Sequence, residues 1–103
     1  MDTQHVKFLM TWDVRPGKEE SYLEFITQEF SDLLVKSNLQ PTDAWYTVYG
    51  DWPEVMMAFV AEDLESLKQF LVSESWERMR KKLATYVKDY QQKAVPLKRG
   101  FQM

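Results

Sequence analysis

The chain has 103 residues, a formal net charge of −3, and 45% hydrophobic and 15% aromatic residues, an ordinary globular balance. The acidic balance argues against nucleic acid as a partner, which needs clustered positive charge. The absence of cysteine excludes disulfides, thiolate metal sites and cysteine nucleophiles. The length predicts one domain over residues 1–103. Without a signal-like N-terminus or a long apolar run, we expect a cytoplasmic protein with no membrane partner.

Side chains alternate between two faces over residues 5–14, which predicts a first strand. Pro16 and Gly17 then break the strand, because proline restricts the backbone and glycine tolerates turn conformations. Apolar residues next recur at helical spacing over residues 18–38, which predicts a first helix. One face of the first predicted strand carries Val6, Phe8, Met10, Trp12 and Val14, which are all apolar.

Residues 44–49 are rich in aromatic and β-branched side chains, which predicts a second strand. A turn separates them from a third predicted strand at residues 55–61, so the two strands form an antiparallel hairpin. Asp63 and Ser73 are suited to cap two further helices, of which the second is expected to reach Tyr90. A fourth strand is predicted over residues 95–102.

This order of elements predicts an α+β, ferredoxin-like β-α-β-β-α-β fold, with a four-stranded antiparallel sheet and both helical segments on one face. The first and third strands carry apolar side chains on both faces, so the sheet needs cover on both sides. A chain this short has little left for the second side, which predicts a homodimer formed through the sheets. The apolar residues available to that interface are Leu9, Met56 or Met57, and Val48.

With its elements in this order, the chain resembles the dimeric α/β barrel proteins, which include antibiotic-biosynthesis-type monooxygenases, stress-responsive A/B barrels and NIPSNAP-like proteins. The resemblance covers nearly the whole chain and lies in three stretches. These are Arg15-Pro16-Gly17-Lys18-Glu19-Glu20 with the following Tyr22-Leu23-Glu24-Phe25, then Asp63-Leu64-Glu65-Ser66-Leu67, and Ser73-Glu74-Ser75-Trp76-Glu77-Arg78-Met79.

The resemblance implies a homodimer whose sheets pack face to face, but it implies activity poorly, because these barrels host many functions. Haem-degrading members use a histidine on the helix after the third strand and an asparagine on the first strand. Here residues 73–83 contain no histidine and the first strand contains no asparagine. Cyclase-type members also rely on a histidine from that helical region, and only His5 is available.

Six residues are candidates for a site. His5 is the only histidine and the only side chain with an ordinary pKa near neutrality, although strand alternation places it away from the helices. An apolar pocket between sheet and helices is one interpretation of four aromatic residues, and plain core packing is the other. These four are Trp12, Tyr49, Trp76 and Tyr90.

Arg99 is the sixth candidate, because a guanidinium among apolar neighbours needs a partner. It could hold a substrate carboxylate or phenolate in a bidentate fork, or it could pair with an acidic residue at the edge of the sheet. Arg99, Tyr49 and His5 are also the candidates for a catalytic role. We expect no metal and no cofactor, because the sequence has neither a ligand cluster nor a phosphate-binding glycine loop.

Three functions remain open on the sequence. The first is a cofactor-independent monooxygenase acting on a small aromatic or quinol-like compound. The second is a non-catalytic module that binds a small molecule, and the third is a structural or interaction domain. A pocket with empty volume favours the first two, whereas a filled core favours the third.

Overall fold

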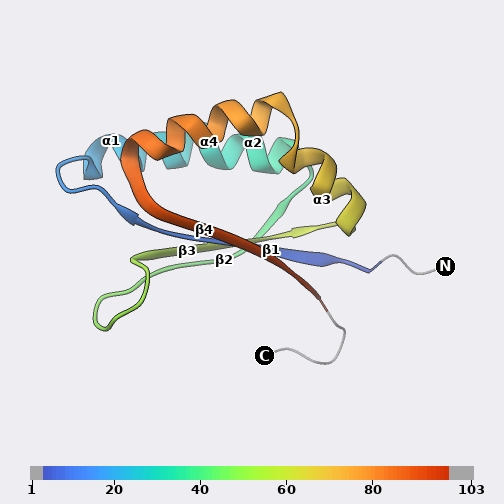
Figure 1. The fold of residues 1–103 in the computed structure, drawn as a ribbon, viewed down its shortest axis with the longest axis horizontal. Helices are drawn as coiled ribbons and strands as arrows, with labels where there is room; N and C mark the ends of the chain where they lie inside the picture. Colours follow the sequence, from blue (N-terminus) through green and yellow to red (C-terminus); the bar gives the residue numbers. More distant parts are fainter. Residues whose placement is uncertain (1–3, 98–103) are drawn as a thin grey trace.

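Four strands form one antiparallel sheet in the order β2-β3-β1-β4, and the helices lie together above one of its faces (Figure 1). The computed structural model describes residues 4–97. The elements are β1 (Val6–Val14), α1 (Glu19–Phe25), a π-helical turn (Ile26–Phe30), α2 (Ser31–Lys36), β2 (Gln40–Tyr46), β3 (Val55–Ala61), α3 (Leu64–Leu71), α4 (Glu74–Tyr86) and β4 (Val87–Pro96). The predicted α+β, ferredoxin-like fold is confirmed.

The alternation of β1 places the core on the helix side of the sheet. Phe8, Met10 and Trp12 are almost completely buried there, while the residues between them remain partly accessible on the other face. The pairing of β1 with β3 sets Met10 opposite Met57 and Thr11 opposite Met56. Met57 therefore faces the helices, and Met56 lies on the open face with Leu9.

The first helical segment changes its winding in the middle. The π-helical turn connects α1 to α2, and Thr27 Oγ1 lies 2.9 Å from the carbonyl oxygen of Leu23, to which it donates a hydrogen bond. A π turn shifts the phase of the helix surface. As a result Ile26, Phe30 and Leu34, spaced four apart, all face the core.

Side chains cap the two later helices as the sequence predicts. Asp63 Oδ1 accepts a hydrogen bond from the backbone nitrogen of Ser66 at 2.7 Å, at the start of α3. Ser73 Oγ accepts one from the backbone nitrogen of Trp76 at 3.2 Å, at the start of α4. Such caps satisfy helix N–H groups that have no partner within the helix.

Several predicted boundaries are wrong. The last helix ends at Tyr86 and not at Tyr90, and the fourth strand begins at Val87 and not at residue 95. Tyr86, Val87 and Tyr90 match helical spacing in the sequence, but Val87 already has an extended backbone (φ −129°, ψ 164°). The predicted part of that strand beyond residue 97, including Arg99, lies outside the described residues.

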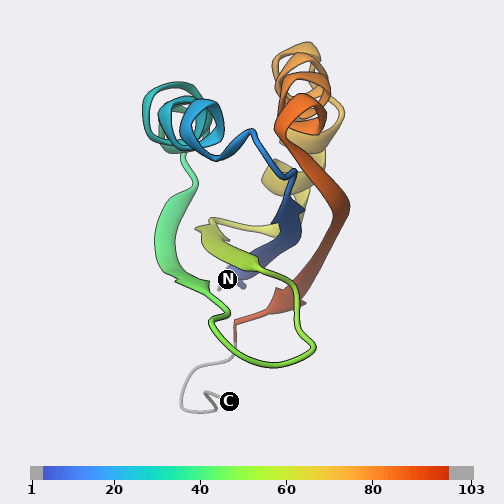
Figure 2. The same ribbon diagram turned by 90° about the vertical axis from the view of Figure 1, so that its left-hand side faces the viewer.

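The second strand also begins earlier than predicted, at Gln40, and ends at Tyr46. Proline usually disfavours a strand, but β2 is an edge of the sheet, where a missing N–H can face outward. Residues 47–54 then form a loop that passes beneath the sheet, on the side away from the helices (Figure 2). Val48 and Tyr49 therefore belong to this loop and not to the strand.

A β-bulge reorients the start of β4. Between the pairs Thr11–Gln91 and Asp13–Lys88, β4 has one more residue than β1, and Asp89 adopts a left-handed backbone with φ of 57°. One extra residue moves the following side chains to the opposite face. The bulge thereby allows both Val87 and Tyr90 to face the helices.

Candidate functional site

A hollow of about 800 Å³ lies against the open face of the sheet, and we call it the sheet hollow. Residues of β1, β2, β3 and β4 form its floor, and residues of the loop 47–54 form part of its wall. Figure 2 shows the path of this loop beneath the sheet. Its volume is within the range typical of small-molecule sites. Half of its lining is apolar, provided by Leu9, Trp45, Trp52, Pro53 and Met56.

The rest of the described lining is polar, with one charged side chain among residues 4–97. Threonines come from β1 and from the loop, while β4 supplies two glutamines and a lysine, of which Gln91 and Lys93 point to the open face. These residues are Thr11, Thr47, Gln91, Gln92 and Lys93. The sheet hollow thus combines an apolar floor with few polar groups, which is the usual composition of a binding pocket.

Hydrogen bonds tie the loop of residues 47–54 to the end of β1. Glu54 Oε1 accepts a hydrogen bond from the backbone nitrogen of Val14 at 2.9 Å. Asp13 Oδ1 in turn accepts one from the backbone nitrogen of Glu54 at 2.8 Å. Within the loop, Thr47 Oγ1 donates to the carbonyl oxygen of Pro53 at 2.8 Å. These bonds hold the base of the loop, and with it Trp52, beside the sheet.

On the other side of the sheet, aromatic rings fill the space beneath the helices. Trp12 stacks on Tyr90 with ring centres 6.0 Å apart, and it meets Phe30 edge-on at 5.8 Å. Its indole nitrogen donates a hydrogen bond to the Tyr22 hydroxyl at 2.9 Å. Trp76 also contacts Phe30, at 5.9 Å between ring centres. Trp12 and Trp76 are 0% and 3% exposed, so both rings are packed on all sides.

The two tyrosines of this cluster stay protonated well above neutral pH. Burial raises the pKa of the Tyr22 hydroxyl, and the hydrogen bond from Trp12 offsets only part of this effect. Burial likewise raises the pKa of Tyr90, against a lowering effect of Arg80. A raised pKa suits a hydroxyl that donates hydrogen bonds, and it does not suit a base at neutral pH.

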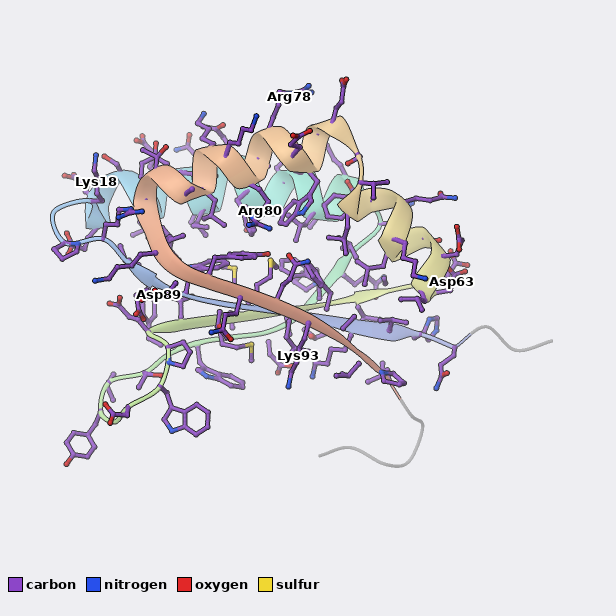
Figure 3. The ribbon with its side chains drawn as sticks, in the orientation of Figure 1. Lys18, Asp63, Arg78, Arg80, Asp89 and Lys93 are labelled. Carbon is purple, nitrogen blue, oxygen red and sulfur yellow. The ribbon has the colours of Figure 1, made fainter. Side chains whose placement is uncertain are left out.

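Arg80 links α4 to β4 at the edge of the aromatic cluster. Its guanidinium carbon lies 4.0 Å from the centre of the Tyr90 ring, an arrangement typical of cation–π contacts. Its Nη1 atom lies 3.5 Å from Gln92 Oε1, which also accepts a hydrogen bond from the Tyr90 hydroxyl at 2.8 Å. Figure 3 shows Arg80 reaching from α4 toward the sheet, and Lys93 on the opposite side of β4.

The structure brings only part of the predicted aromatic pocket together. Trp12 and Tyr90 stack directly, and Trp76 joins them through Phe30. Tyr49 is separate, because it lies in the loop with 95% of its surface exposed. Arg99 lies outside the described residues.

His5 lies one residue before β1 and is exposed. Its ring nitrogen Nδ1 is 2.9 Å from the carbonyl oxygen of Glu62, to which it donates a hydrogen bond as the Nδ1–H tautomer. His5 also lines a second hollow of about 740 Å³ near the far end of the sheet, with Gln40 and Thr42. It is not among the residues of the sheet hollow.

Sequence reasoning missed most residues of the sheet hollow. Leu9 and Met56 were expected on the open face, but Trp45, Trp52 and Lys93 were not assigned to a site. Trp52 is far from Lys93 in the sequence, and only the path of the loop beneath the sheet makes them neighbours of one hollow. The period-two pattern of Gln91 and Lys93 was a weak signal that both belong to one strand face.

Within residues 4–97, no three acidic or histidine side chains gather closely enough to hold a metal ion. Over the same part of the chain, no helix is both long and apolar enough to cross a bilayer.

Comparisons with known proteins establish the fold. No family profile matches the chain, and no curated protein sequence matches it. Among solved structures, a NIPSNAP family protein of Agrobacterium tumefaciens aligns with a TM-score of 0.69 and 13% identity, covering 98% of this chain and 91% of that chain. The resemblance to NIPSNAP-like proteins inferred from the sequence is confirmed in the fold.

Two other solved structures have the same architecture. A dimeric protein of unknown function and ferredoxin-like fold from Bacteroides fragilis aligns with a TM-score of 0.68 and 11% identity, over 90% of this chain and 96% of that chain. A protein of unknown function from Bacteroides thetaiotaomicron, described as a possible oxidoreductase, aligns with a TM-score of 0.69 and 8% identity, over 92% of this chain and 99% of that chain.

Proposed function

We propose that the protein is a homodimeric module that binds a small, largely aromatic compound in the sheet hollow. The observation that carries this proposal is the hollow itself, about 800 Å³ in volume, on an open face lined by Leu9, Met56 and Trp45. An exposed apolar face of this kind usually marks a binding surface. The space beneath the helices is filled by aromatic rings, so the open face is the better place for a ligand.

A second copy of the chain would close the hollow. The Bacteroides fragilis neighbour is dimeric, and packing two open faces together would remove the apolar floor from water on both copies. Enclosure would also increase the buried surface of a ligand in the hollow, which is how such sites gain affinity. The proposed module is therefore a dimer with its ligand between the sheets.

The lining favours binding over catalysis. Among residues 4–97 it holds no histidine, carboxylate or tyrosine, and these are the side chains that most often transfer protons near neutral pH. A cofactor-independent monooxygenase is the second candidate, because Trp45 and Trp52 suit an electron-rich aromatic substrate and one neighbour of the same fold is described as a possible oxidoreductase.

A thermal-shift screen of the purified protein against aromatic acids, quinols and flavins tests the proposal. A compound present at 100 times its Kd stabilises the folded protein by about 2.7 kcal/mol, which raises the melting temperature of a small domain by roughly 10 °C. Trp45→Ala should abolish the shift. Leu23→Ala is the matched control, since Leu23 is 55% exposed on α1 and Trp45 is 56% exposed on β2.

Two results would decide between the candidates. If a bound compound is also consumed together with dissolved oxygen, measured with an oxygen electrode, the monooxygenase reading replaces the binding module. If no compound shifts the melting temperature while sedimentation shows an intact dimer, a structural role replaces both.

A further inference from the structure

We infer that the sheet hollow selects a ligand with an anionic end, which Lys93 binds while the aromatic body of the ligand packs on Trp45 and Trp52. This inference rests on the proposed function, because it concerns the charge of the compound that the hollow accepts. It assigns a role to the polar rim that Gln91 and Lys93 of β4 form.

The charge of the lining is the first observation. The chain as a whole has a formal net charge of −3, but of the described residues that line the hollow, Lys93 is the single charged one. A positive lining beside apolar walls focuses its field on the enclosed space. A neutral ligand would leave Lys93 without a counter-charge once a second copy covers the face, and that is costly.

The second observation is that the ammonium group of Lys93 forms no ion pair with another described residue. The other lysine of this region, Lys7, is already paired with Asp43 at 2.9 Å. Lys93 takes part in none of the ion pairs formed among residues 4–97. It stands opposite Leu9 in the pairing of β1 with β4, and Figure 3 shows it on the side of β4 away from the helices. Its ammonium group is therefore available to a ligand.

The placement of Gln91 is the third observation. It pairs with Thr11, and Lys93 pairs with Leu9, so the Gln91 and Lys93 side chains share the open face and both residues line the hollow. Gln92 pairs with the buried Met10, and its amide faces the helices, where Oε1 accepts the hydrogen bond of the Tyr90 hydroxyl at 2.8 Å. The rim of the hollow thus presents an ammonium group and the amide N–H groups of Gln91, all of which suit an anion.

The width of the sheet sets the size of the ligand. Trp45 pairs with Met56, Met56 with Thr11, and Thr11 with Gln91. This ladder crosses three strand spacings, or about 14 Å. The Trp45 and Lys93 side chains extend into this span from its two ends. The remaining space suits a planar body of one or two rings with one carboxylate or phenolate.

The test compares two probes of nearly equal shape, 2-naphthoate and its neutral amide 2-naphthamide. Their Kd values are measured at pH 7 by titration calorimetry with the full-length protein. We expect naphthoate to bind at least tenfold more tightly than naphthamide. Lys93→Met should remove this preference and leave the Kd of naphthamide within twofold of its original value. Lys88→Met is the matched control, because it removes a lysine from β4 that does not line the hollow.

Gln91→Glu tests the amide beside Lys93. The new carboxylate would share the open face with Lys93 and would repel an anionic ligand, so the preference for naphthoate should disappear while the protein stays folded. A preference that survives both Lys93→Met and Gln91→Glu would overturn the inference.

The remaining outcomes separate this inference from the proposed function. If both probes bind the unaltered protein equally well, the inference is wrong and the proposed function stands. If neither probe nor any compound of the thermal-shift screen binds, the proposed function fails as well. If Lys93→Met lowers the dimer fraction in sedimentation without changing the preference, Lys93 pairs across the interface and the inference is wrong.

Discussion

At the residue scale, the packing of Trp76 tests whether the aromatic residues beneath the helices stabilise the fold or bind a ligand. Its ring lies 5.1 Å from Phe70, 5.9 Å from Phe30 and 6.3 Å from Phe8, measured between ring centres. We expect Trp76→Ala to lower the free energy of unfolding by about 3–5 kcal/mol, because it leaves a cavity in a packed core. Urea denaturation measures the loss.

The control for Trp76→Ala is Val72→Ala, since Val72 is 85% exposed at the end of α3. This change should alter stability by about 0.5 kcal/mol or less. A loss well under 3 kcal/mol for Trp76→Ala would contradict core packing and return the residue to a binding role.

Tyr22 gives a second prediction at this scale, on alkaline stability. Burial raises its pKa in the folded protein, whereas in the unfolded chain the hydroxyl ionises near pH 10. The stabilising contribution is therefore complete below pH 10 and is lost as the pH rises further. In that range the ionisation of Tyr22 should lower the free energy of unfolding by up to about 1.4 kcal/mol for each pH unit.

Urea denaturation from pH 9 to pH 11 measures the effect. Tyr22→Phe should make the decline shallower, even though it lowers stability at every pH by removing the hydrogen-bond acceptor of Trp12. Tyr49→Phe is the control, because Tyr49 is exposed and should leave the slope unchanged. Equal slopes for all three proteins would show that Tyr22 ionises normally in the folded state.

At the scale of the elements, the bulge at Asp89 gives the sharpest prediction. Its left-handed backbone costs a β-branched residue roughly 1–2 kcal/mol, whereas glycine adopts it freely. Asp89→Val should therefore lower the free energy of unfolding by about that amount, and Asp89→Gly should change it little. Lys88→Val, one residue earlier in the same strand, is the control. If Asp89→Val proved as stable as Asp89→Gly, the bulge would not be needed to place Tyr90.

The same bulge explains why the sequence predicted β3 well and β4 poorly. Residues 55–61 show an uninterrupted strand pattern with apolar side chains on both faces. The predicted strand therefore matches β3. In β4 the extra residue interrupts the alternation, so that Val87 and Tyr90 imitate the spacing of a helix. Local signals that need no long-range contact, such as the caps Asp63 and Ser73, were confirmed.

At the scale of the whole molecule, the sequence predicted the open face but not the site on it. Strand alternation is local, so it placed Leu9 on the open side of β1 and Phe8, Met10 and Trp12 under the helices. The sheet hollow depends on how far a loop folds back beneath the sheet, and no local pattern encodes that path. Trp52 and Lys93 could therefore be assigned to one site only from the structure.

Assembly is the last property of the whole molecule to test. Two open faces packed together would bury on the order of 2,000 Å² if the dimer is obligate, and folding would then be coupled to association. The melting temperature should consequently rise with protein concentration. Leu9→Glu, which places a charge at the centre of the open face, should lower both the dimer fraction and this concentration dependence. Leu23→Glu, on the helix side, should change neither. A folded monomer at micromolar concentration in sedimentation would contradict the dimer, and the sheet hollow would then be open to solvent.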